Sequence, residues 1–234
     1  MITTVFFDLD GTLLPMDQEV FVKNYLGRMA RKMAPYGYDP DTLVKAIWTG
    51  TGAMVKNDGS ALNETVFWNV FSKFFDRDTR VDEPLFEEFY RVEFQEVRHD
   101  CGFDPRARET IREIKEMGLS AVLATNPLFP AIATLSRVKW AGLNPEDFDL
   151  ITTYENSRYC KPNPDYYREI LGKLNLTGEQ CLMVGNDVSE DMVARELGFQ
   201  VFLLTDCMIN KENRDISQYP HGSFPELMDY IRSL

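Results

Sequence analysis

The stretch FFDLDGTLLP, residues 6–15, places two aspartates one residue apart directly after an apolar run. Asp8 and Asp10 point the same way if the strand continues through them, because strand side chains alternate with a period of two. Two carboxylates so close together repel each other and need an opposite charge to coexist. A cation beside Asp8 keeps it ionised as a nucleophile, and the neighbouring carboxylate raises the pKa of Asp10 enough for it to act as an acid.

The chain contains five short apolar runs, and segments with helical periodicity follow most of them. The runs cover residues 3–10, 119–126, 148–155, 180–187 and 200–206, and the helical segments near them cover 104–118, 164–174 and 188–197. Uninterrupted apolar runs are typical of parallel strands that are buried on both faces. Strands that alternate with helices predict an α/β fold with a doubly wound, Rossmann-like parallel sheet.

Polar side chains stand at the carboxyl ends of these predicted strands. Thr125 and Asn126 end the second strand, Lys161 follows the third, and the fourth ends in GNDVSED with Asn186, Asp187 and Asp191. The carboxyl ends of parallel strands meet at one edge, so we expect one crevice to collect these groups. The carboxylates need a hard cation such as Mg²⁺, while Thr125 and Lys161 suit an anionic group. This combination fits phosphoryl transfer, which relies on positioning and charge stabilisation.

More than 100 residues without a good strand separate the first predicted strand from the second. Helical patterns occupy residues 18–34, 40–48, 63–75 and 83–98 of this interval. A crossover between parallel strands needs only one helix. We therefore predict an all-helical domain at residues 16–100, inserted into an α/β core formed by residues 1–15 and 101–234, with hinges after Leu14 and before Asp104.

Composition narrows the possible partners and the cellular location. The formal net charge of −12 argues against nucleic acid or an anionic membrane as a partner. The chain has 4 cysteines without a CxxC pair, which disfavours a zinc site or a disulfide framework. No stretch approaches the ~20 apolar residues of a membrane span, and the first residues, MITTVFFD, lack a basic signal-peptide region. We expect a cytoplasmic protein without a membrane partner. The apolar helical positions of Trp48, Trp68 and Trp140 predict core packing.

The motifs, taken together, resemble those of the haloacid dehalogenase (HAD) superfamily. DLDGT, the strand-end Thr125, Lys161 before Pro162 and the acidic GNDVSED occur in the order that this superfamily uses. The resemblance covers residues 1–15 and 101–234, and the helical insertion looks like the superfamily's C1-type cap.

The resemblance implies a role for each matching residue. Asp8 is the expected nucleophile, which forms an aspartyl-phosphate, and Asp10 is expected to protonate the leaving alkoxide and then to activate water. Thr125 and Lys161 are the expected phosphate-binding groups, and Thr12 and Asn126 are further expected substrate contacts. Mg²⁺ is expected between Asp8, the backbone carbonyl of Asp10 and the fourth motif.

The fourth motif departs from the commonest pattern, in which an aspartate follows the glycine directly. Here Asn186 stands at that position and Asp187 comes next. Strand register favours the side-chain oxygen of Asn186 as the metal ligand, whereas charge favours Asp187, so both stay open. Asp191 is expected to orient Lys161 or a metal-bound water.

The sequence therefore predicts a Mg²⁺-dependent phosphomonoesterase that acts on a small phosphorylated metabolite. Other chemistry on the same scaffold stays open: a carbon–halogen hydrolase, a phosphonate hydrolase with a Schiff-base lysine, or a sugar-phosphate mutase. A non-catalytic protein that binds a phosphorylated metabolite is the alternative from another class. The sequence names neither the substrate nor the oligomeric state.

Overall fold

A computed structural model describes all residues of the chain, 1–234. Its centre is a six-stranded sheet in the order β3-β2-β1-β4-β5-β6, and every neighbouring pair of strands is parallel. The strands are β1 (Thr4–Phe7), β2 (Ser120–Leu123), β3 (Leu150–Ile151), β4 (Cys181–Gly185), β5 (Gln200–Leu204) and β6 (His221–Gly222). The doubly wound α/β prediction is confirmed, and five of these strands lie within the predicted runs. The short edge strand β6 was not predicted.

Helices cover both faces of the sheet. The α-helices are α1 (Gln18–Met33), α2 (Pro40–Val55), α3 (Asn63–Phe71), α4 (Glu83–Arg91), α5 (Pro105–Glu116), α6 (Ala131–Trp140), α7 (Pro164–Leu174) and α8 (Phe224–Ser233). Seven 3₁₀ segments lie between the helices and strands: η1 (Ala34–Tyr36), η2 (Ser72–Phe74), η3 (Thr79–Asp82), η4 (Glu93–Asp100), η5 (Pro145–Asp147), η6 (Gly178–Gln180) and η7 (Met192–Leu197). None of the helices has both the length and the hydrophobicity to cross a bilayer.

The alternation of side chains along β1 divides the core into two parts. Val5 and Phe7 belong to a large apolar cluster that includes buried residues of α5, α6 and α8. Phe6 points to the other face and belongs to a smaller cluster with residues of α7 and η7. Strands covered in this way have few exposed side chains, and all four residues of β1 are buried.

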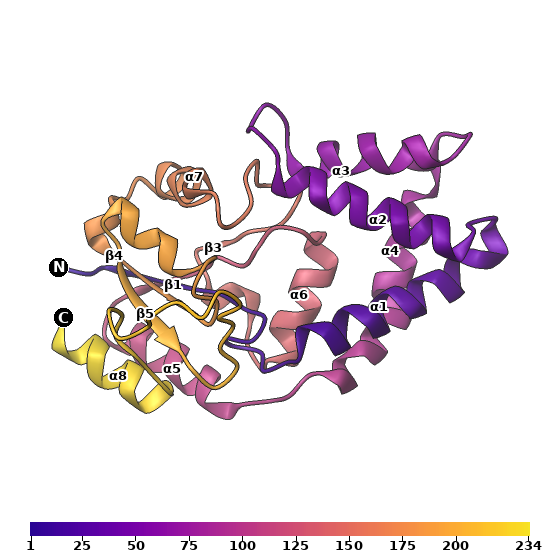
Figure 1. Cartoon of the computed structure of the whole chain (residues 1–234). Coiled ribbons are helices and arrows are strands. Elements are labelled where there is room, and N and C mark those ends of the chain that lie inside the picture. The colour runs from indigo at the N-terminus through magenta and orange to yellow at the C-terminus, as the bar shows by residue number, and fades with distance from the viewer.

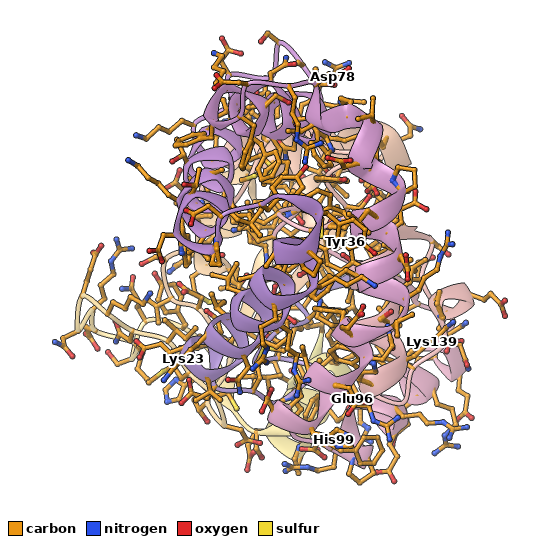
Figure 2. The ribbon with its side chains drawn as sticks, turned by 90° about the vertical axis from the view of Figure 1, so that its right-hand side faces the viewer. Lys23, Tyr36, Asp78, Glu96, His99 and Lys139 are labelled. Carbon is orange, nitrogen blue, oxygen red and sulfur yellow. The ribbon has the colours of Figure 1, made fainter.

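The interval between β1 and β2 contains α1 to α4 and η1 to η4, as its helical patterns predicted. Figure 1 shows α1 to α4 gathered on one side of the molecule, with α6 beside them and both termini on the opposite side of the sheet. Lys23, Tyr36 and Glu96 lie on the outer side of this helical region, which faces the viewer in Figure 2. Apolar residues of these helices belong to the same cluster as Val5 and Phe7. The division into a core and a separate cap domain stays a prediction.

The two chain segments that enter and leave the helical region lie side by side. Met16 and Cys101 form an antiparallel bridge, and the amide of Gly102 donates to the carbonyl of Pro15 at 2.7 Å. These contacts lie between the two predicted hinge positions. The pairing fixes where the helical region begins and ends relative to β1.

Several predicted helix boundaries were wrong. The helix predicted at 40–48 continues to Val55, through Gly50 and Gly52. The helix predicted at 83–98 ends at Arg91 and continues as η4, and the one predicted at 188–197 is only η7. We predicted neither α6 nor α8. Asp104 caps α5, since its side chain accepts from the amide of Arg106.

Candidate active site

Asp8 follows β1 directly, at the carboxyl end of a central strand. Its amide donates to the carbonyl of Val184 at 2.9 Å, so β4 holds the backbone at this point. One carboxylate oxygen, Oδ1, lies 2.9 Å from Lys161 Nζ, and the other, Oδ2, accepts from the Thr12 hydroxyl at 3.1 Å. The structure therefore places a buried carboxylate between a cation and a hydroxyl at the edge where ligands bind in open α/β sheets.

Lys161 lies in the loop before α7 and is only 1% exposed. Its ammonium group also lies 2.6 Å from Asp191 Oδ1. Burial by itself lowers the pKa of Lys161, but the carboxylates of Asp191 and Asp8 outweigh it and raise that pKa well above its usual value. Lys161 is a fixed positive charge that Asp191 contacts, and the orienting role of Asp191 stays a prediction.

The turn after Asp8 brings Thr12 to the fourth motif. Thr12 Oγ1 lies 3.0 Å from Asn186 Oδ1, so Asp8 and Asn186 share one hydroxyl neighbour. The turn depends on Gly11, whose φ of +87° is unfavourable for other residues. A Cβ at Gly11 would also lie 2.3 Å from Asn186 Nδ2. The glycine thus permits both the turn and the approach of Asn186.

Asp10 points to a different set of residues from Asp8. The strand ends at Phe7, so the alternation of strand side chains does not make Asp10 point the same way as Asp8. The carboxylate of Asp10 forms an ion pair with Arg137 through Oδ2, while Oδ1 is buried and makes no hydrogen bond. Burial raises the pKa of Asp10, and the Asp8 carboxylate adds to this effect, whereas Arg137 opposes it. A carboxyl group with a raised pKa and one free oxygen can carry a proton.

Arg137 was missed in the sequence. It lies on α6 and is fully buried, and its guanidinium lies 4.3 Å from the centre of the Phe129 ring. Its neighbours on the buried face of α6 include Ala133, Thr134 and Val138. An arginine at a position that helical periodicity assigns to the core was the available signal.

Thr125 and Asn126 follow β2 beside the same edge. The Thr125 carbonyl accepts from the Thr152 hydroxyl at 2.6 Å and from the Tyr166 hydroxyl at 2.9 Å, and these bonds fix the backbone. Asn126 accepts from the Lys161 amide at 3.3 Å and donates to Glu190 Oε2 at 3.0 Å. Asn126 therefore connects the loop of Lys161 to the fourth motif.

The two candidate ligands of the fourth motif have different surroundings. Asn186 is buried, and its amide group donates to the Cys207 carbonyl at 2.7 Å, which leaves Oδ1 facing Thr12. Asp187 Oδ1 accepts from the amides of Ser189 and Glu190 at 2.7 and 3.0 Å. Asn186, and not Asp187, therefore contacts the Thr12 hydroxyl that also contacts Asp8.

The donors suit a magnesium ion in kind. No group of three or more His, Cys, Asp and Glu side chains is arranged to bind a metal. The expected donors are instead the Asp8 carboxylate, the Asp10 backbone carbonyl and the Asn186 side-chain amide oxygen. The Thr12 hydroxyl lies within 3.1 Å of both Asp8 and Asn186. An all-oxygen set that leaves room for water fits Mg²⁺. The individual roles of the site residues stay predictions.

Comparison with known proteins shows the family to which the chain belongs. The family model described as haloacid dehalogenase-like hydrolase matches residues 2–205. A glyceraldehyde 3-phosphate phosphatase of Methanocaldococcus jannaschii is 30% identical over 132 residues, which are 56% of this chain and 57% of that protein, less than two thirds of its length. A ribulose-1,5-bisphosphate 5-phosphatase of Halopiger xanaduensis is 24% identical over 87% of this chain and 84% of its own.

Solved structures share the fold at low sequence identity. A HAD phosphatase from Thermococcus onnurineus has a TM-score of 0.60 and 21% identity, and the match covers 98% of each chain. A 2-haloacid dehalogenase from Pseudomonas syringae pv. Tomato has a TM-score of 0.64 and 19% identity, over 100% of this chain and 99% of its own. Because the family model spans most of the sequence, this chain belongs to the haloacid dehalogenase-like hydrolases.

Proposed function

We propose that this protein is a Mg²⁺-dependent phosphomonoesterase that acts on a small phosphorylated metabolite through an aspartyl-phosphate. The observation that carries the proposal is the buried Asp8 carboxylate, 2.9 Å from Lys161 Nζ at the end of β1, with a second carboxyl group two residues later. The phosphatase names of the relatives support the substrate class. We also propose that residues 16–100 act as a cap domain over this site.

In the proposed reaction an Asp8 oxygen attacks phosphorus, and the bond from phosphorus to the ester oxygen breaks. Asp10 donates its proton to the leaving alkoxide, which is why a raised pKa and a free Oδ1 matter. Asp10 then takes a proton from water as the water oxygen attacks phosphorus, and the bond from phosphorus to the Asp8 oxygen breaks. The products are the alcohol and inorganic phosphate, and the Asp8 carboxylate is regenerated.

The other polar residues bind and orient the reactants. Thr125 and Lys161 bind the phosphoryl oxygens, with Thr12 and Asn126 beside them, and Asp191 holds Lys161 in place at 2.6 Å. Asp8, the Asp10 carbonyl and Asn186 or Asp187 hold Mg²⁺, which supplies charge neutralisation for the phosphoryl group. The surroundings of Asn186 support it as the ligand from the fourth motif.

A panel of sugar phosphates, nucleotides and small organic phosphates, assayed with Mg²⁺ and with chelator, tests this function. We expect Mg²⁺-dependent release of phosphate, abolished by Asp8→Asn. The exposed Asp58→Asn is the matched control and should retain activity. Full activity of Asp8→Asn would refute the nucleophile, and halide release from haloacids in the presence of chelator, without any phosphate release, would assign dehalogenase chemistry instead.

A further inference from the structure

The helical region contains a cavity of about 440 Å³, and none of the proposed catalytic or metal-binding residues lines it. Residues of α1, α2, α3 and α4 line one side of it, and the loops after β2 and β3 line the other. Figure 1 shows these helices and the start of α6 arranged around a common centre. The cavity is within the size range of small-molecule binding sites.

The walls of this cavity are mainly aromatic and aliphatic. Ile47 and Trp48 come from α2, Phe67 and Trp68 from α3, and Leu128 and Phe129 from the loop after β2. Trp48 is 53% exposed, which contradicts our prediction that it packs in the core. An apolar lining of this kind favours an apolar ligand, because binding removes both surfaces from water.

Two aromatic residues add polar groups to the lining. The indole N–H of Trp68 is buried, in a residue that is only 3% exposed, and it interacts with the Tyr154 hydroxyl. Burial raises the pKa of Tyr154, so its hydroxyl is neutral. Neither group adds charge to the cavity lining.

The charged residues of the lining disfavour a ligand with a second anionic group. The cavity lining contains one cation, Arg91. It also contains four glutamates, namely Glu64, Glu83, Glu87 and Glu155. Glu87 pairs with Arg91 at 2.9 Å, while Glu64 and Glu83 share Arg80 at 3.1 and 3.4 Å. The carboxylates therefore outnumber the cations, and an added carboxylate or phosphate would be repelled.

Phe129 links the cavity to the proposed phosphate site. Its side chain lines the cavity, and its ring lies 4.3 Å from the guanidinium of Arg137, which pairs with Asp10. In sequence, Phe129 follows Thr125 by four residues, and Leu128 donates its amide to the Asn126 carbonyl at 2.8 Å. One short loop therefore carries polar groups of the proposed site and also residues that line the cavity.

We propose that this cavity binds the organic group of the substrate, and that this group is an uncharged aromatic or branched aliphatic alcohol esterified to phosphate. The inference rests on the proposed function for its phosphoryl end. It predicts selection against bisphosphates and against esters whose alcohol carries an acid group.

Two matched phosphate esters test the selectivity, namely 1-naphthyl phosphate and 4-carboxyphenyl phosphate. Thr51 of α2 lines the cavity, so Thr51→Trp narrows it, whereas the exposed Thr49 of the same helix lies outside it and Thr49→Trp is the control. We expect the wild type and Thr49→Trp to prefer the naphthyl ester in kcat/KM by about tenfold or more. Thr51→Trp should reduce that preference by a similar factor, mainly through KM.

A binding measurement separates this inference from the proposed function. Trp48 and Trp68 both line the cavity, so 1-naphthol alone should change tryptophan emission in the wild type and bind about tenfold more weakly to Thr51→Trp. Such binding without hydrolysis of any ester would refute the phosphatase and support the cavity as an apolar site. Equal binding to wild type and Thr51→Trp, or an unchanged ester preference in Thr51→Trp, would overturn the inference.

Discussion

Arg137, a fully buried arginine on α6, pairs with Asp10, the second aspartate of the N-terminal motif. The guanidinium also contacts Phe129 and lies 3.4 Å from the Thr134 hydroxyl. A buried ion pair is costly to break on one side only, because the remaining charge loses its partner. The pair therefore ties the orientation of Asp10 to the packing of α6.

Replacing Arg137 alone should destabilise the protein through Asp10. We expect Arg137→Met to lower the free energy of unfolding by about 3 kcal/mol, since the Asp10 carboxylate is left without its cation. Asp10→Asn in the same chain should recover a large part of that loss. Urea unfolding of the two single variants and the double variant measures the coupling, and strictly additive losses would show that the two side chains act independently.

Lys161 connects two carboxylates, and its removal should affect both stability and activity. Lys161→Met leaves Asp8 and Asp191 facing each other in a buried site, so we expect a loss of about 3–5 kcal/mol and no detectable phosphatase activity. Adding Asp191→Asn should restore much of the stability and none of the activity. Lys173→Met, at a half-exposed lysine paired with Glu169, is the control and should change neither quantity. Activity retained by Lys161→Met would exclude a role in phosphate binding.

The strand-end rule explains why much of the site could be predicted from sequence. Asp8, Lys161 and Asp191 lie far apart in the chain, yet parallel strands bring their carboxyl ends to one edge, and the three side chains meet at 2.6 to 2.9 Å. The contact of Thr12 with Asp8 rather than Asp10 was not predicted, because the strand ends before the motif and the chain turns at Gly11.

Other features depend on tertiary packing and leave only a weak local signal. A single arginine in the amphipathic segment 131–140 does not show whether it is exposed or buried against Asp10. Likewise, Trp48 has an apolar position on α2, but its side chain lines a cavity and is 53% exposed. The helix boundaries were wrong where glycines continued α2, since neighbouring helices outweigh local propensity.

Asn186 and Asp187 should respond differently to truncation. We expect Asn186→Ala to raise the Mg²⁺ concentration for half-maximal activity about tenfold or more, because it removes the oxygen that faces Thr12. Asp187→Ala should mainly cost about 1 kcal/mol of stability through its lost bonds to the amides of Ser189 and Glu190. Mg²⁺ titrations and thermal unfolding of both variants distinguish the two candidate ligands. A loss of Mg²⁺ affinity in Asp187→Ala and not in Asn186→Ala would make Asp187 the ligand.

Glu190 should make the metal-free protein less stable as the pH rises. Burial raises its pKa from 4.5 to about 7, although Lys161 opposes this shift. Between these two values the folded state binds more protons than the unfolded chain, so stability falls with rising pH and then levels off above about 7. We expect Glu190→Gln to be more stable than the wild type at pH 8, by about 1–3 kcal/mol, and equally stable near pH 4.

Glutamine keeps an oxygen for the bond from Asn126 Nδ2, which measures 3.0 Å. Urea unfolding with chelator across this range, with the exposed Glu196→Gln as control, measures the effect. A constant difference between Glu190→Gln and the wild type at every pH would contradict it.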